Sequence, residues 1–148
     1  MTLNRSPAQP EPTTEPPYGA AVIVYRRVAP ACEYLVLHRA HSGPEEEGDW
    51  AWTPPSGGRH AGEPVHLCAA RELEEETGLK LDLQRTKLGN VEWSVFRAEA
   101  DVDAAVVLDP EHDRHLWLPA TKAAARCQPE LVGQRFIQAD DCLRETQP

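Results

Sequence analysis

The sequence has no apolar run approaching the roughly 20 residues that cross a bilayer, and its N-terminus lacks the charged-then-apolar pattern of a secretory signal. Basic residues are in the minority: the 148 residues include 24 Asp and Glu against 15 Lys and Arg, a formal net charge of -9. This balance argues against binding that neutralises nucleic-acid phosphates or an anionic membrane surface. We expect a cytoplasmic protein, monomeric or homodimeric, with neither a membrane partner nor stable nucleic-acid binding.

Cysteine and histidine spacings typical of metal sites are also missing. Cys32, Cys68, Cys127 and Cys142 form no C-x-x-C pair, which favours neither a zinc site nor a small disulfide framework. The histidines form no i, i+4 pair of the zinc protease type. The cysteines are expected to be reduced thiols that pack as small apolar residues.

Prolines are concentrated in residues 1–17, among Thr, Ser, Gln and Glu. That composition buries too little apolar surface to offset the entropy of ordering, so a disordered tail is predicted. Residues 18–148 are predicted to form a single domain. Apolar and β-branched runs predict strands at residues 18–25, 33–38, 81–87, 91–99, 104–108 and 115–118.

The strongest helix signal covers residues 64–77. Pro64 suits the first helical turn, and Gly78 suits the left-handed position just past the end. Further helices are expected at residues 120–126 and about 130–144. Strands interleaved with helices predict a mixed α/β layered domain.

Three glutamates share one face of the helix predicted at residues 64–77. At about 100° per residue, Glu72, Glu75 and Glu76 fall within one arc, where carboxylates three and four positions apart repel one another. Arg71 can compensate one of them, and hard oxygen ligands on a rigid element are what Mg²⁺ or Mn²⁺ binds. A solvated charged face is the other interpretation. A structural Ca²⁺ site would need an alternating Asp/Asn/Gly loop, which this segment lacks.

The spacing around these glutamates resembles a known signature. Gly57 is followed after five residues by Glu63, and after seven more by RELEEETGL, which runs from Arg71 to Leu79. This is similar to the signature of the Nudix hydrolases: Gly, five spacers, Glu, seven spacers, then RE-apolar-x-EE-x-G-apolar. The runs WTPPSGGRHAGE and EHDRHLWL resemble the diadenosine tetraphosphate hydrolase branch, and the (d)NTP pyrophosphohydrolases are the other branch that the pattern resembles.

The resemblance implies the Nudix fold, an α/β/α sandwich around a mixed β-sheet. It also implies Mg²⁺-dependent hydrolysis of a pyrophosphate bond in a nucleoside diphosphate linked to another moiety. The expected substrate is a small nucleotide, either a dinucleoside polyphosphate or a (d)NTP, attacked by a metal-activated water. The alternative is a regulatory module of the same fold that binds a nucleotide without cleaving it.

The resemblance also implies roles for individual residues. The implied metal ligands are Glu72, Glu75 and Glu76, with a backbone carbonyl of Ser56 or Gly57. Glu63 is implied to support the loop and to share in metal binding. Arg71 would orient the glutamates, and the general base would be a signature glutamate, Glu99 or Glu111. The groups expected to contact substrate are Gly58, Arg39, Arg59, Trp52 and Phe96. The tryptophans Trp50, Trp52, Trp93 and Trp117 are available either for stacking on a base or for packing in the core.

Overall fold

The computed structural model describes residues 10–43, 45 and 47–145. Within them lies a seven-stranded mixed sheet of order β3-β2-β1-β6-β5, in which β4 pairs with β1 and β7 with β2. The strands are β1 (Gly19–Val28), β2 (Ala31–Arg39), β3 (Trp52–Thr53), β4 (Ser56–Gly58), β5 (Gln84–Arg85), β6 (Trp93–Glu99) and β7 (His112–Leu118). The helices are α1 (Val65–Thr77), α2 (Ala120–Arg126) and α3 (Glu130–Glu145), with a 3₁₀ turn at Ala40–Ser42.

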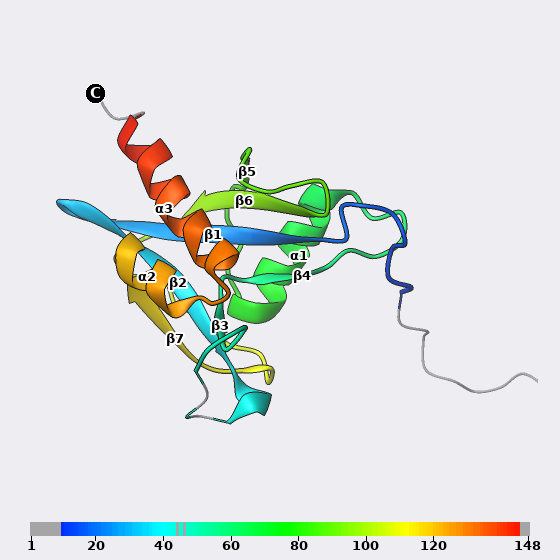
Figure 1. The fold of residues 1–148 in the computed structure, drawn as a ribbon, viewed down its shortest axis with the longest axis horizontal. Helices are drawn as coiled ribbons and strands as arrows, with labels where there is room; N and C mark the ends of the chain where they lie inside the picture. The colour runs from blue at the N-terminus through cyan, green and yellow to red at the C-terminus, as the bar shows by residue number, and fades with distance from the viewer. Residues whose placement is uncertain (1–9, 44, 46, 146–148) are drawn as a thin grey trace, which may run out of the picture.

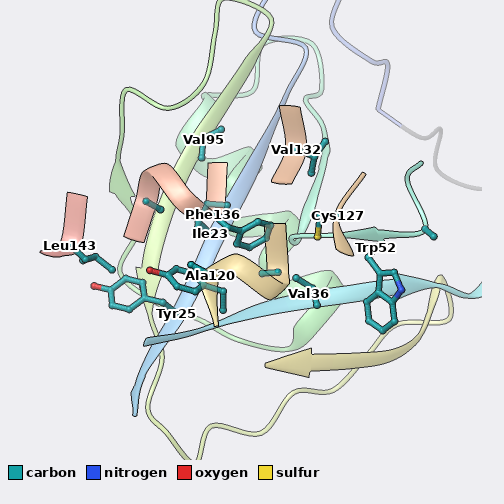
Figure 2. Packing of buried hydrophobic residues seen from close by; sticks show 14 residues of the cluster. Ile23, Tyr25, Val36, Trp52, Val95, Ala120, Cys127, Val132, Phe136 and Leu143 are labelled. Atoms are coloured by element: carbon teal, nitrogen blue, oxygen red, sulfur yellow. The ribbon is translucent and has the colours of Figure 1, made fainter. Parts of the chain in front are cut away.

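Helices cover both faces of the sheet: α1 lies behind it and α2 and α3 lie in front (Figure 1). Strand β1 supplies both cores, because successive side chains of a strand point to opposite faces. Val22 and Val24 pack on the α1 side, and Ile23 packs with Phe136 on the α2–α3 side. Figure 2 shows the second cluster gathered between the strands and the two C-terminal helices. This is the predicted α/β/α sandwich around a mixed sheet.

Strand β4 reaches the centre of the sheet directly before α1 begins. It pairs antiparallel with β1, which places Gly57 opposite Ala20. A Cβ atom added to Gly19 would lie 2.4 Å from the Gly57 carbonyl oxygen, so glycine is required where the two backbones meet. Strand β1 also pairs in parallel with β6, from Gly19 opposite Trp93 to Tyr25 opposite Glu99.

Most of the predicted elements are confirmed, and the segment at 104–108 is an error. Residues 104–108 form no strand: they run past the end of α1, where the Val107 N–H donates to the Thr77 carbonyl at 2.8 Å. The strand predicted at 81–87 is reduced to Gln84–Arg85, because Leu81 and Leu83 pack against the α1-side cluster instead. Among the described residues, no helix has the length and apolarity of a membrane span.

The disordered tail predicted for residues 1–17 is wrong for its second half. The Thr13 N–H donates to the Arg59 carbonyl at 2.9 Å, and the Ala61 N–H donates to the Glu11 carbonyl at 2.8 Å. The Arg59 side chain donates to the Pro17 carbonyl at 2.7 Å. Composition misses this docking because the bonds involve main-chain groups, which every sequence has. Residues 1–9 lie outside the described part of the chain.

Candidate active site

Helix α1 carries the glutamates and is oriented by its apolar face. Leu73 is buried against the sheet, which turns the acidic face toward β4. The helix ends at Gly78, whose φ of 74° is left-handed and whose N–H donates to the Glu74 carbonyl at 2.8 Å. Pro64 precedes the first helical residue, so both predicted ends are confirmed to within one residue.

Two of the glutamates are buried against β4. Glu76 is 5% exposed, and its Oε1 accepts the Ser56 N–H at 3.1 Å. The Glu72 carboxyl lies against Gly57, where an added Cβ would be 2.1 Å from its Cδ. Glu75 is the solvent-facing member, with its side chain 55% exposed. The site thus combines a buried pair of carboxyls with a third that faces solvent.

Burial dominates the electrostatics of the buried pair. It raises the pKa of Glu72, and it raises the pKa of Glu76 to about 9, with the neighbouring Glu72 carboxyl adding to the effect. The Ser56 N–H acts in the opposite direction on Glu76 without cancelling it. The two carboxyls lie close enough that each affects the pKa of the other. A bound cation would stabilise the charged form of both.

Arg71 holds the cluster from the opposite side. It donates from Nε to Glu63 at 2.9 Å and from Nη2 to the other Glu63 oxygen at 3.0 Å, a bidentate pair. Its Nη1 donates to Glu72 at 2.8 Å, and its Nη2 donates to the Gly58 carbonyl at 2.9 Å. The hydrogen bonds from Arg71 lower the pKa of Glu63. One guanidinium therefore ties the helix to both sides of the preceding loop.

Glu63 lies outside the cavity that the glutamates line. Both of its oxygens are taken, by Arg71 and by the His60 N–H at 3.0 Å. This geometry agrees with support of the loop and not with a share in metal binding.

A cavity of about 500 Å³ opens beside the three glutamates, and we call it the acidic cavity. Its walls come from β4, α1, the end of β2 and the loop before β7. It is lined by Arg39, His41, Thr53, Ser56, Gly57, Gly58, Glu72, Glu75, Glu76, Asp109, Glu111 and His112. The fold thus brings Arg39, Gly58 and Glu111 to the signature glutamates, although they are distant in sequence.

Sequence reasoning missed Asp109 and His112. Their Oδ1 and Nδ1 atoms lie 2.7 Å apart, and the Asp109 carboxylate is close enough to contribute to the raised pKa of Glu76. The signal is the run DPEHD at residues 109–113, which spans the start of β7 and follows the irregular segment at 104–108.

Two charged residues expected at the site, Glu99 and Arg59, lie elsewhere. Glu99 is 3.3 Å from Arg27 and lines a different cavity, beside Tyr25 and Lys80. Arg59 is committed to main-chain carbonyls of the N-terminal segment. These positions separate both residues from the acidic cavity.

The two aromatic residues proposed to contact substrate are core residues. Trp52 is fully buried, and its Nε1 donates to Glu47 at 3.2 Å. Phe96 is 2% exposed, within the cluster on the α1 side of the sheet. Neither ring offers a face to a ligand, so this expectation is wrong for both residues.

The donor set suits a hard divalent cation. Among the described residues, no group of three His, Cys, Asp or Glu is already arranged as a metal cage. Glu75 is nonetheless exposed at the cavity edge, 3.5 Å from Arg71, and lines the cavity together with Glu72 and Glu76. Carboxylates and carbonyls are the ligands that Mg²⁺ and Mn²⁺ prefer.

Known structures share this fold. A C. elegans Ap4A hydrolase in a binary complex superimposes with a TM-score of 0.70 at 21% identity, covering 86% of this chain and 97% of that one. The E. coli dihydroneopterin triphosphate pyrophosphohydrolase gives 0.69 at 21% identity, with coverages of 88% and 99%. The Nudix domain of Shewanella oneidensis NrtR, complexed with ADP ribose, gives 0.64 at 14% identity, with coverages of 84% and 86%.

Sequence comparison gives the family. An octanoyltransferase of Myxococcus xanthus is 33% identical over 118 residues, which cover 72% of this chain and 32% of that protein, so the chain spans about a third of that relative's length. The family model described as the NUDIX domain matches residues 16–138. That match takes in the whole signature and the strands and helices around it, and the chain therefore belongs to the Nudix family.

Proposed function

We propose that this chain hydrolyses a pyrophosphate bond in a dinucleoside polyphosphate or a (d)NTP, with Mg²⁺ or Mn²⁺ bound by Glu72, Glu75 and Glu76. One observation carries the proposal: the buried carboxyl of Glu76, the mostly buried carboxyl of Glu72 and the exposed carboxylate of Glu75 converge on a cavity of about 500 Å³. A buried carboxyl pair is costly unless a cation compensates it. The first substrate class agrees with the name of one protein of similar fold, the Ap4A hydrolase, and the second shares a triphosphate group with the compound named for another, the dihydroneopterin triphosphate pyrophosphohydrolase.

The cation would neutralise phosphate charge and lower the pKa of a bound water. The protein supplies the remaining requirements. Glu72 and Glu76 are fixed by Arg71, Gly57 and the Ser56 N–H, so they hold their positions without reorganisation. A backbone carbonyl of Ser56 or Gly57 completes the set of protein oxygens. Arg39, at the same cavity, is placed to bind a phosphate oxygen.

Proton transfer from the attacking water is assigned to this cavity as well. Glu111 lines it and is solvent-exposed, whereas Glu99 lies in another cavity. We therefore favour Glu111 or a signature glutamate as the base, with the hydrogen-bonded Asp109 and His112 fixing the loop beside it.

The first experiment compares Glu75→Gln with the native protein on a panel of dinucleoside polyphosphates, (d)NTPs, ADP-ribose, NADH and coenzyme A, with and without Mg²⁺. The substitution removes a charge and scarcely changes the shape, and we expect kcat to fall by about 10²–10⁴-fold with the Tm nearly unchanged. Glu74→Gln is the matched control: Glu74 precedes it on the same helix, pairs with Lys80 at 3.3 Å and lines the other cavity.

Equal activity of the Glu75→Gln and native proteins would reject the proposed site. Metal-dependent nucleotide binding without turnover of any compound would favour the regulatory module instead.

A further inference from the structure

A second cavity, of about 510 Å³, adjoins the acidic cavity, and we call it the aromatic cavity. The two share a wall formed by Arg39, Thr53 and Ser56–Gly58. Beyond that wall the lining is mostly tryptophan, proline and aliphatic side chains, contributed by the loop before β3, by Trp93 and by the first turn of α3. Asn90 and Glu92 also line it. A nucleotide with its phosphates in the acidic cavity would extend its nucleoside into this space.

Arg135 of α3 lines the aromatic cavity and is 7% exposed. Its Nε atom is buried and has no hydrogen-bond partner among the described residues. No ion pair to Arg135 occurs within residues 10–43, 45 and 47–145, and burial lowers the pKa of the guanidinium. A buried donor without a partner costs free energy, so the Nε–H of Arg135 is available to an acceptor on a ligand in the cavity.

Close helix packing places Arg135 at the cavity. At Gly133 an added Cβ would lie 2.2 Å from the Ala124 carbonyl oxygen, so α2 and α3 approach closely there. Val132, in the same turn as Gly133, also lines the aromatic cavity. The position of the guanidinium is therefore fixed by the backbone of two helices.

Two tryptophan rings border the same space. Trp50 is 51% exposed and has a φ of 65°, a left-handed conformation that is rare for a bulky residue; its N–H donates to the Gln128 carbonyl at 2.7 Å. Trp93 packs over Gly19, where an added Cβ would be 2.4 Å from its Cη2. Indole rings at the edge of a cavity offer stacking surfaces for a planar base.

We propose that the aromatic cavity binds the base of the nucleotide and that Arg135 selects a base with a ring carbonyl, such as a 6-oxopurine, over adenine. The inference rests on the proposed function. A guanidinium only donates hydrogen bonds. The O6 and N7 atoms of a 6-oxopurine both accept them, whereas adenine has an amino group in place of O6 and would turn a donor toward the donors of Arg135.

The test measures the binding of IMP and AMP by calorimetry, because the two nucleotides differ at the carbonyl and amino position. The native protein is expected to bind IMP about tenfold or more tightly than AMP. Arg135→Met, which keeps the apolar stem, is expected to reduce this ratio to about one. Arg126→Met is the matched control and should keep the native ratio, since Arg126 is exposed and stacks on the buried Trp52 instead, 5.0 Å from its ring centroid.

Two further readouts separate ligand recognition from a structural role. The Tm of Arg135→Met should equal or exceed that of the native protein, because the substitution removes a buried donor that has no partner among the described residues; a side chain needed for folding would lower it. Trp50→Ala should weaken IMP and AMP binding by a similar factor, about fivefold or more, and leave their ratio unchanged.

Equal affinity of the native protein for IMP and AMP, or no saturable binding of either, would overturn the inference. An equal decrease in the affinity for IMP and for AMP in Arg135→Met would also overturn it, because the guanidinium would then bind the phosphate and not the base. A preference for IMP without hydrolysis of any nucleotide would reject the proposed function alone. Hydrolysis without base preference would reject this inference alone.

Discussion

Gly57 shows how closely the acidic cavity is built around single residues. Its missing side chain leaves the space that the Glu72 carboxyl occupies, so glycine is needed there for a contact and not for an unusual φ angle. The same carboxyl is held by Arg71 at 2.8 Å. The carboxyl oxygens are therefore fixed at the cavity wall before any cation or substrate is bound, which is the preorganisation that catalysis of phosphate chemistry requires.

The raised pKa of Glu76 predicts how stability depends on pH. The unfolded chain loses this proton near the ordinary value of 4.5, and the folded protein keeps it to about 9, so stability should fall as the pH rises through that window. With a chelator present, the native Tm is expected to decrease from pH 5 to pH 9. Glu76→Gln should flatten the decrease, because the amide carries no charge at any pH.

Thermal unfolding of both proteins across this range, with Glu74→Gln as the control that keeps the native slope, provides the measurement. Identical slopes for the native and Glu76→Gln proteins would contradict the prediction.

Spacing alone predicted the residues of α1 that face the acidic cavity, because in a helix the separation of two residues along the sequence determines whether their side chains lie on the same face. It could not predict the burial of Trp52 or Phe96, since tryptophan and phenylalanine suit a core as well as a ligand site. Arg135 was not identified either. Nothing around it in the sequence indicates that its guanidinium would be buried without a partner, which depends on the packing of α2 against α3.

At the level of elements, the predictions are accurate where the sequence pattern is long or has residues that mark the ends of the element. Helix α1 has Pro64 and Gly78 at its ends, and β1 is a continuous apolar run, so both were placed to within a few residues. Residues 104–108 are a short apolar run, which is typical of a buried strand. In the structure their apolar side chains pack against the α1-side cluster without strand pairing, and the Val107 N–H donates to the Thr77 carbonyl at the end of α1.

The contact between α2 and α3 supplies a prediction at this scale. Gly133→Ala would press a Cβ against the Ala124 carbonyl, a main-chain atom that cannot rotate away. We expect the free energy of unfolding to fall by about 1–3 kcal/mol, net of any gain in helix propensity. Urea denaturation measures this change.

Gly58→Ala is the matched control, because its added Cβ would meet nothing closer than the Tyr18 carbonyl at 3.8 Å. A Gly133→Ala protein as stable as the native one would show that the two helices can move apart at little cost.

For the molecule as a whole, cation binding should appear as added stability. A ligand that binds the folded state alone, at 100 times its Kd, stabilises it by about 2.7 kcal/mol. In a chain of this length that corresponds to a rise in Tm of about 5–10 °C. The measurement compares Tm in MgCl₂ and in KCl at equal ionic strength, and Glu75→Gln should reduce the rise. The same Tm in both salts would be evidence against a cation site.

The parallel pairing of β1 with β6 also has a consequence for how the chain is made. The edge of β1 that pairs with β6 stays unpaired until Trp93 and the residues after it have been synthesised. Contacts between such distant residues slow folding, because the intervening chain must first be brought together. During synthesis the β1–β2 hairpin is therefore complete while one edge of β1 and both of its apolar faces are still open. A nascent chain at this stage is at its most prone to associate with others, and we expect the ribosome-bound chain to depend on chaperones until β6 has emerged.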